Sequence, residues 1–211
     1  MATRLEFIER AIRQIYGDLP TDASAITKNL VNSWLNDAIA AAAKKNWTDN
    51  IQIDQISFVN NSFYTSFKNL TITDAGQQFL YQLTLPDIPV GLGRNEGISI
   101  LQFVDANGFV SDTAIPLSQN QVGYIRGQRP IPNKILYYSE GIFLYMITTL
   151  QLFTPNYTGK VKMVSGGDKT DLNSVLNVPS DYWGYMVEYI KMNLAFERAQ
   201  PKELVNDKSD N

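Results

Sequence analysis

The C-terminal stretch Val178–Asn211, VPSDYWGYMVEYIKMNLAFERAQPKELVNDKSDN, constrains how the rest of the chain must fold. Ser180 can cap a helix, because serine is a favoured capping residue, and Asp181 in the first turn complements the helix dipole. Pro201 lies just beyond Gln200, where helices commonly stop. We therefore predict a helix from about Asp181 to Gln200, followed by a short polar tail.

This predicted helix carries two apolar stripes. The first stripe comprises Tyr182, Tyr185, Met186, Tyr189, Met192 and Phe196, and the second comprises Trp183, Val187, Ile190 and Leu194. A helix that is apolar nearly all round must be covered on nearly all sides, and its aromatic residues favour a contact surface. We expect the first stripe to lie inside the subunit and the second stripe to face a neighbouring subunit.

Two helices are predicted at the N-terminus. Thr3 to Glu6 reads as a capping box, and the helix after it continues to about Tyr16 with one apolar face, formed by Leu5, Ile8, Ile12, Ile15 and Tyr16. Gly17 ends it. A second helix is expected from Thr21 or Asp22 to about Lys45. The short connection makes the pair an antiparallel or angled hairpin.

After Trp47 the apolar residues alternate with a period of two, which is typical of half-buried strands. The segments expected to be extended start near Ile51, Phe63, Phe79, Ile98, Phe109, Ile135, Ile142 and Lys160. Asn107-Gly108 is a hairpin signal. The sequence therefore predicts an α+β fold: a helical hairpin over 1–47, an antiparallel sheet or small barrel of about five to eight strands over 48–168, and 169–211 as a helix and tail that pack with 1–47 as one helical layer.

The composition excludes several kinds of site. The chain has no Cys and no His, so disulfides, Cys or His metal ligands, and catalytic triads that need either residue are ruled out. Charged residues make up only 18% and the formal net charge is −3, which leaves a weakly charged surface. No long apolar run or signal-peptide pattern occurs, so we expect a protein that is made in a cytoplasm, stays soluble and does not engage a membrane.

No catalytic, cofactor-binding or metal site is predicted. The candidate carboxylates all lie beside turn residues and show no pairing for acid–base chemistry: Asp87, Glu96, Asp105, Asp112 and Glu140. The glycine pairs at 91–93 and 166–167 fit neither a Walker nor a dinucleotide pattern. Arg126 and Arg129 lie in a loop rich in glycine and proline. There they indicate an exposed loop, or one that pairs with acidic groups of a neighbour, rather than a nucleic-acid site.

The order of these elements resembles the head-to-tail connector proteins of tailed bacteriophages, in particular the neck ring or adaptor proteins of podovirus-type and crAss-like phages. Four stretches carry the resemblance: LEFIERAIRQIYGDLP, ITKNLVNSWLNDAIAAAAKKNW, LPDIP and the C-terminal stretch quoted above. The resemblance implies a structural virion protein, made in the host bacterial cytoplasm and located in the neck. Its copies, twelve in similar phages, would form a ring that joins the portal to further neck or tail rings.

In such a ring, DNA passes through the channel without sequence-specific binding, and terminal segments reach onto neighbouring subunits. The expected contact residues are therefore Trp183, Val187, Ile190, Leu194, Arg126, Arg129, Pro201 and Leu204. Two other readings stay open: a β-module that binds carbohydrate or protein, recognisable by exposed Tyr or Trp platforms, and a small enzyme that uses carboxylates such as Asp105 and Glu140.

Overall fold

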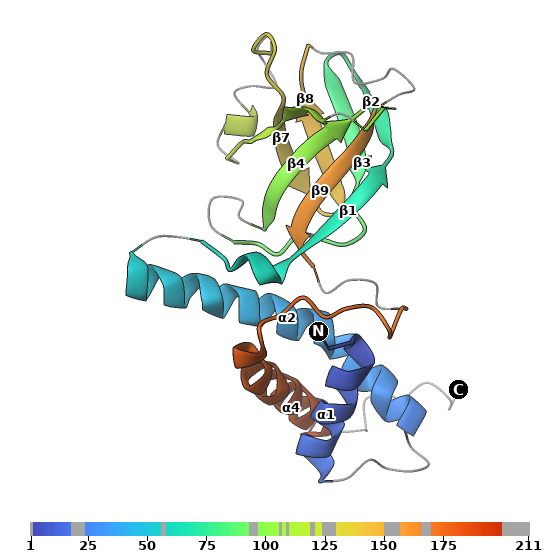
Figure 1. The fold of residues 1–211 in the computed structure, drawn as a ribbon, viewed down its shortest axis with the longest axis vertical. Helices are drawn as coiled ribbons and strands as arrows, with labels where there is room; N and C mark the ends of the chain where they lie inside the picture. The colour runs from blue at the N-terminus through green and yellow to red at the C-terminus, as the bar shows by residue number, and fades with distance from the viewer. Residues whose placement is uncertain are drawn as a thin grey trace, which may run out of the picture. The chain divides into compact units, whose positions relative to one another are not determined.

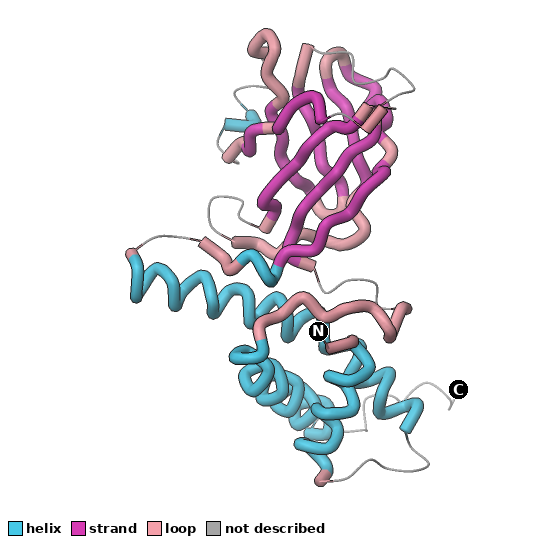
Figure 2. Tube along the Cα trace, in the orientation of Figure 1, coloured by secondary structure: helices cyan, strands magenta, loops and turns pink. Residues whose placement is uncertain are grey.

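The computed structural model describes residues 2–17, 24–55, 58–92, 97–105, 107–108, 110–118, 121–123, 130–149, 157–165 and 170–199. The chain divides into two compact units: a helical unit made of 1–42 with 168–211, and a β unit made of 43–167. Figure 2 shows the helices in cyan and the strands in magenta. The long helices are formed by residues near the two ends of the sequence, and the strands by residues in its middle. This confirms the predicted α+β class, and Figure 1 labels the elements.

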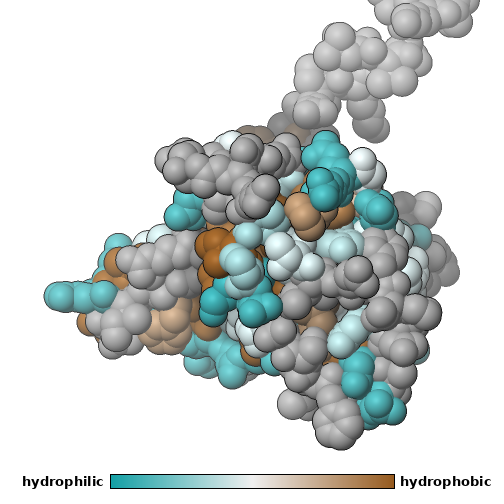
Figure 3. All heavy atoms as spheres, turned by 90° about the horizontal axis from the view of Figure 1, so that it is seen from above, coloured by the Kyte–Doolittle hydropathy of each residue, from teal (hydrophilic) through white to brown (hydrophobic). Residues whose placement is uncertain are grey.

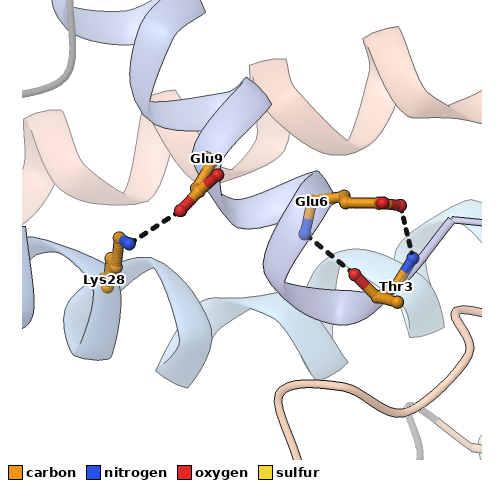
Figure 4. A network of polar contacts seen from close by, with 4 residues as sticks. All are labelled: Thr3, Glu6, Glu9 and Lys28. Atoms are coloured by element: carbon orange, nitrogen blue, oxygen red, sulfur yellow. Dashed lines mark hydrogen bonds and ion pairs between the residues drawn. The ribbon is translucent and has the colours of Figure 1, made fainter.

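The helical unit begins with α1 (Arg4–Tyr16), whose predicted capping box is present. The Thr3 hydroxyl accepts a hydrogen bond from the Glu6 backbone N–H at 3.2 Å, and the Glu6 carboxylate accepts one from the Thr3 backbone N–H at 2.9 Å (Figure 4). Gly17 ends the helix with a left-handed φ of 84°, and its N–H donates to the Arg13 carbonyl. Neighbouring residues thus satisfy part of the backbone groups at each end of the helix, as the sequence predicted.

The buried face of α1 is rotated from the predicted one. Phe7, Ile8, Ala11 and Ile12 are buried, together with the side chain of Arg4, whereas Tyr16 is exposed. The Arg4 guanidinium donates to the side-chain oxygens of Asn32 and Asn36. Burial of a charged group requires such partners, and they come from a helix far away in the sequence.

Helix α2 (Ser24–Asp54) runs antiparallel to α1 in the helical unit. Glu9 of α1 pairs with Lys28 of α2 at 2.8 Å (Figure 4), whereas Arg4, earlier in α1, reaches Asn32 and Asn36, later in α2. Its buried residues recur with helical spacing: Val31, Leu35, Ala38, Ile39 and Ala42. Trp34 is half-buried, and its indole Nε1 is buried without a hydrogen-bond partner. The predicted helical hairpin is therefore present.

Helix α2 also continues beyond its predicted end near Lys45, and the strand predicted from Ile51 is wrong, because residues 51–54 are helical. Side-chain pairs one turn apart support this extension: Lys45 pairs with Asp49 at 3.0 Å, and the Asn50 amide donates to the Asn46 side-chain oxygen at 3.3 Å. No Gly or Pro interrupts the segment. An i,i+4 pattern of polar pairs thus prevails over the short alternation of isoleucines.

The segment before the last helix lies along the start of α1. Thr3 and Val175 form an isolated antiparallel bridge. The backbone N–H groups of Arg4 and Leu5 donate to the carbonyls of Ser174 and Leu172 at 2.9 and 2.8 Å. These carbonyls satisfy donors that the first turn of a helix leaves free, so the segment that precedes η3 is hydrogen-bonded to the start of α1.

The last helix begins later than predicted. A 3-10 turn, η3 (Ser180–Tyr182), precedes α4 (Trp183–Ala199). The predicted capping role of Ser180 is wrong, because Pro179 occupies the cap of η3 and no side-chain cap hydrogen bond is made. The fixed φ of proline suits the entry to a helical turn without the help of a hydroxyl.

The β unit contains a short 3-10 turn and nine described strands: η1 (Asn61–Phe63), β1 (Tyr64–Leu70), β2 (Ile72–Gln77), β3 (Leu80–Thr84), β4 (Ile98–Val104), β5 (Val110–Thr113), β6 (Ile115–Pro116), β7 (Leu136–Glu140), β8 (Phe143–Ile147) and β9 (Thr158–Val164). They form a four-stranded sheet in the order β1-β9-β4-β5 and a five-stranded sheet in the order β2-β3-β8-β7-β6. All pairings are antiparallel except β6 with β7. The strands described here form no closed barrel, so the small-barrel alternative is not realised.

One hydrophobic core is shared by the two sheets. Its members come from β3, β7 and β8 on one side and from β4 and β9 on the other: Leu83, Tyr137, Leu144, Met146, Leu101, Phe103, Val161 and Met163, with others. Gly159 in β9 lies so close to Leu83 that a Cβ atom there would collide with the leucine side chain. Glycine at this position therefore allows the two sheets to approach each other.

The predicted hairpin at Asn107-Gly108 is present, and a second hairpin joins β7 to β8. Gly108 has a φ of 84°, and its N–H donates to the carbonyl of Asp105 in the turn between β4 and β5. Gly141, with a φ of 60°, lies in the turn between β7 and β8. Glycine adopts a left-handed backbone with less strain than other residues, which explains why glycine occupies these positions in both turns.

Candidate assembly surface

The stripe of α4 that was expected to face another subunit is buried in its own chain. Val187 and Leu194 are 4% exposed and Ile190 is fully buried. Trp183 is half-buried: its ring meets that of Phe7 edge-on at 5.6 Å, and the Arg10 guanidinium lies 5.1 Å from the ring centroid. The Trp183 indole N–H donates to the carbonyl of Val178 at 3.4 Å. This stripe is part of the core of the helical unit.

The expected orientation of α4 is therefore wrong. Residues of the other stripe form the exposed face: Tyr185 is 40% exposed, Met192 60% and Phe196 68%. Met186, which was placed in the same stripe, is an exception and is fully buried. Branched aliphatic side chains pack densely without polar atoms, whereas a tyrosine keeps its hydroxyl in water most easily at a surface. This difference in side-chain chemistry was the available signal for the orientation.

The exposed residues of α4 recur with helical spacing, at positions 185, 192 and 196. Glu188 and Lys191 accompany them on the exposed side and pair with each other at 3.5 Å. We call Tyr185, Met192 and Phe196 the α4 stripe. Aromatic residues and methionine are enriched in protein–protein interfaces, so this stripe has the composition of a contact surface.

Four other predicted contact residues lie outside the described residues. They are Arg126 and Arg129, which precede β7 in the sequence, and Pro201 and Leu204, which follow α4 in the sequence. Their proposed contacts therefore remain predictions.

Two of the carboxylates considered for catalysis, Asp105 and Asp87, accept hydrogen bonds from the backbone just after them, whereas Asp112 lies in β5. The Asp105 side chain accepts a hydrogen bond from the Asn107 N–H at 2.9 Å, and Asp87 accepts one from the Ile88 N–H at 2.8 Å. Such bonds are typical of carboxylates that stabilise turns. Glu140 lies exposed at the end of β7. Within the described part of the chain, no group of three or more acidic residues is placed to hold a metal ion.

Aromatic residues on the outer face of the five-stranded sheet bear on the carbohydrate-binding alternative. The rings of Tyr138 and Tyr145 stack at 5.2 Å with an interplanar angle of 21°, and Phe143 meets Tyr145 at 6.4 Å. Tyr138 is buried, and of these three only Phe143 is exposed. The rings thus contact one another instead of lying side by side as a platform for a sugar.

Figure 3 shows one face of the molecule, on which hydrophilic and hydrophobic residues are interspersed over the visible described surface.

Among the described helices, none has the length and apolarity to span a bilayer. No protein-family model matches the sequence, and no curated protein shows significant similarity to it.

Proposed function

We propose that this protein is a structural component of a phage neck, in which copies of the chain form a head-to-tail connector ring between the portal and further tail components. In this role the chain acts without enzymatic activity, and DNA passes through the ring. The resemblance of the sequence to such connectors motivates the proposal, which also assigns the protein to the virion.

The observation that carries the proposal is the α4 stripe. Tyr185, Met192 and Phe196 together leave a large apolar area in water on one helix. Burial of apolar surface contributes roughly 25 cal/mol per Å², so three such side chains can supply several kcal/mol to a subunit contact. A ring needs a head-to-tail interface between two different patches, and the α4 stripe is proposed as one of them.

The experiment that tests this function compares Phe196→Asp with the unaltered chain. We expect the variant to remain folded by circular dichroism, because Phe196 is mostly exposed, but to lose the oligomer seen by native mass spectrometry and electron microscopy in the presence of the portal. A carboxylate forced into an apolar contact costs several kcal/mol without a partner.

Ala195→Asp is the matched control, because Ala195 is the exposed neighbour of Phe196 and the substitution adds the same charge. It should keep the oligomer. A purified chain that stays monomeric both alone and with the portal would overturn the ring. An oligomer that survives Phe196→Asp would remove the α4 stripe from the contact.

A further inference from the structure

A group of lysines lies on the outer face of the four-stranded sheet of the β unit. Along β9 the burial alternates: Val161 and Met163 point into the core, while Lys160 and Lys162 are on the opposite face. In β1, Ser66 pairs with Lys162, and exposed Lys68 lies two residues further along. Figure 1 shows β1, β9 and β4 side by side. We call Lys68, Lys160 and Lys162 the lysine face.

The lysine face has no acidic counterpart on its own strands. The sequences of β1, β9 and β4 contain no Asp or Glu, and within the described residues no ion pair involves any of the three lysines. The Cα atoms of Lys160 and Lys162 lie about 7 Å apart, the usual spacing of residues two positions apart on a strand. Like charges at such spacing repel each other, so the face favours a ligand that carries several negative charges.

The neighbouring side chains indicate which polyanion fits. Gln102 pairs with Lys160 across the sheet, and Ser66 and Thr158 lie near the lysines. Amides and hydroxyls donate hydrogen bonds to phosphate oxygens, as lysine does. The face has no arginine for the two-point recognition of carboxylates. Its one aromatic ring, Tyr64, lies under the Lys162 ammonium at 5.8 Å, so it is not free to stack on the bases of a single strand.

We propose that the lysine face binds the phosphate backbone of double-stranded DNA without reading its sequence. The inference rests on the proposed function for its biological setting, because it gives the DNA that passes through the ring a contact surface on each subunit. The β unit, which carries the lysine face, also differs in charge from the rest of the chain. Residues 43–167 contain nine Lys and Arg and eight Asp and Glu, whereas the remaining residues contain nine Lys and Arg and thirteen Asp and Glu.

The test measures the binding of a fluorescent 20-base-pair duplex by anisotropy, over a series of salt concentrations, with the full chain in solution. We expect binding whose logarithm falls linearly with the logarithm of salt concentration. In Lys68→Gln/Lys160→Gln we expect this negative slope to become shallower by about 1.8, since each lost phosphate contact reduces its magnitude by about 0.9. The variant leaves in place Lys162, whose Nζ donates to the Asn61 side chain.

Lys44→Gln/Lys134→Gln is the matched control, because it removes two other exposed lysines and the same charge. It should leave both affinity and slope nearly unchanged. No duplex binding at low salt, or an equal loss in both double variants, would overturn the proposal. Binding of a polyglutamate peptide in preference to duplex would assign the face to an acidic protein instead. None of these readouts needs a ring, so failure here and failure of ring assembly are distinguishable.

Discussion

Tyr137 connects a single side chain to the pH dependence of the whole fold. Burial in the core between the two sheets, with a smaller contribution from nearby Tyr64, raises the pKa of Tyr137 to about 12, from an ordinary value of 10.0. The neutral phenol is therefore favoured in the folded chain. The stability from this group is fully present below pH 10 and is lost as the pH rises through about 12, where the fold must release a proton that the unfolded chain has already lost.

We predict that the free energy of unfolding falls more steeply with pH between 10 and 12 in the unaltered chain than in Tyr137→Phe, by up to about 1.4 kcal/mol per pH unit. Urea titrations at each pH measure the difference. Other groups titrate in the same range but contribute equally to both proteins, so identical slopes would contradict a buried phenol at this position.

Among the elements, α4 allows the folding role of its buried side to be separated from the assembly role that we propose for its exposed side. Val187 and Leu194 lie in the core, so we predict that Val187→Asp destabilises the folded chain by about 3 kcal/mol or more. Thermal unfolding followed by circular dichroism measures this loss. Glu188 is exposed on the other side of the helix, so Glu188→Asp serves as the control and should leave the midpoint nearly unchanged. A Val187→Asp variant as stable as the unaltered chain would place Val187 outside the core.

The elements also show how far the sequence alone predicts this molecule. The capping box of α1 and the turns at Gly108 and Gly141 were predictable, because each depends on residues within a few positions of one another. The end of α2 was not, because Ile51 and Ile53 fit either period, and the deciding pairs, such as Lys45 with Asp49, precede them. Burial of Arg4 depends on Asn32 and Asn36, which no local pattern connects to it.

The candidate surfaces also divide into features that neighbouring residues determine and features that depend on contacts distant in the sequence. Two apolar stripes on α4 were visible in the sequence, but the side that faces the core depends on which surface α1 presents, through Phe7 and Arg10. The lysine face was hidden for a related reason. Lys160 and Lys162 alternate visibly along one strand, whereas Lys68 joins them only through the pairing of β1 with β9.

For the whole molecule, the two proposals require opposite responses to salt. A contact through Tyr185, Met192 and Phe196 removes apolar area from water, and salts do not screen that contribution. A contact through Lys68, Lys160 and Lys162 exchanges counterions for phosphates and weakens steeply as salt is added. The charge difference between the two units of the chain is consistent with separate surfaces for these two tasks.

We therefore predict that raising NaCl from 50 to 500 mM leaves self-association of the chain unchanged or stronger, while it weakens duplex binding by more than about tenfold. Sedimentation velocity measures the first quantity and anisotropy the second, on the same preparation. Phe196→Asp should change only the first, and Lys68→Gln/Lys160→Gln only the second. If both quantities fell together with salt, the subunit contact would be electrostatic, and the α4 stripe would not be the surface that joins the copies.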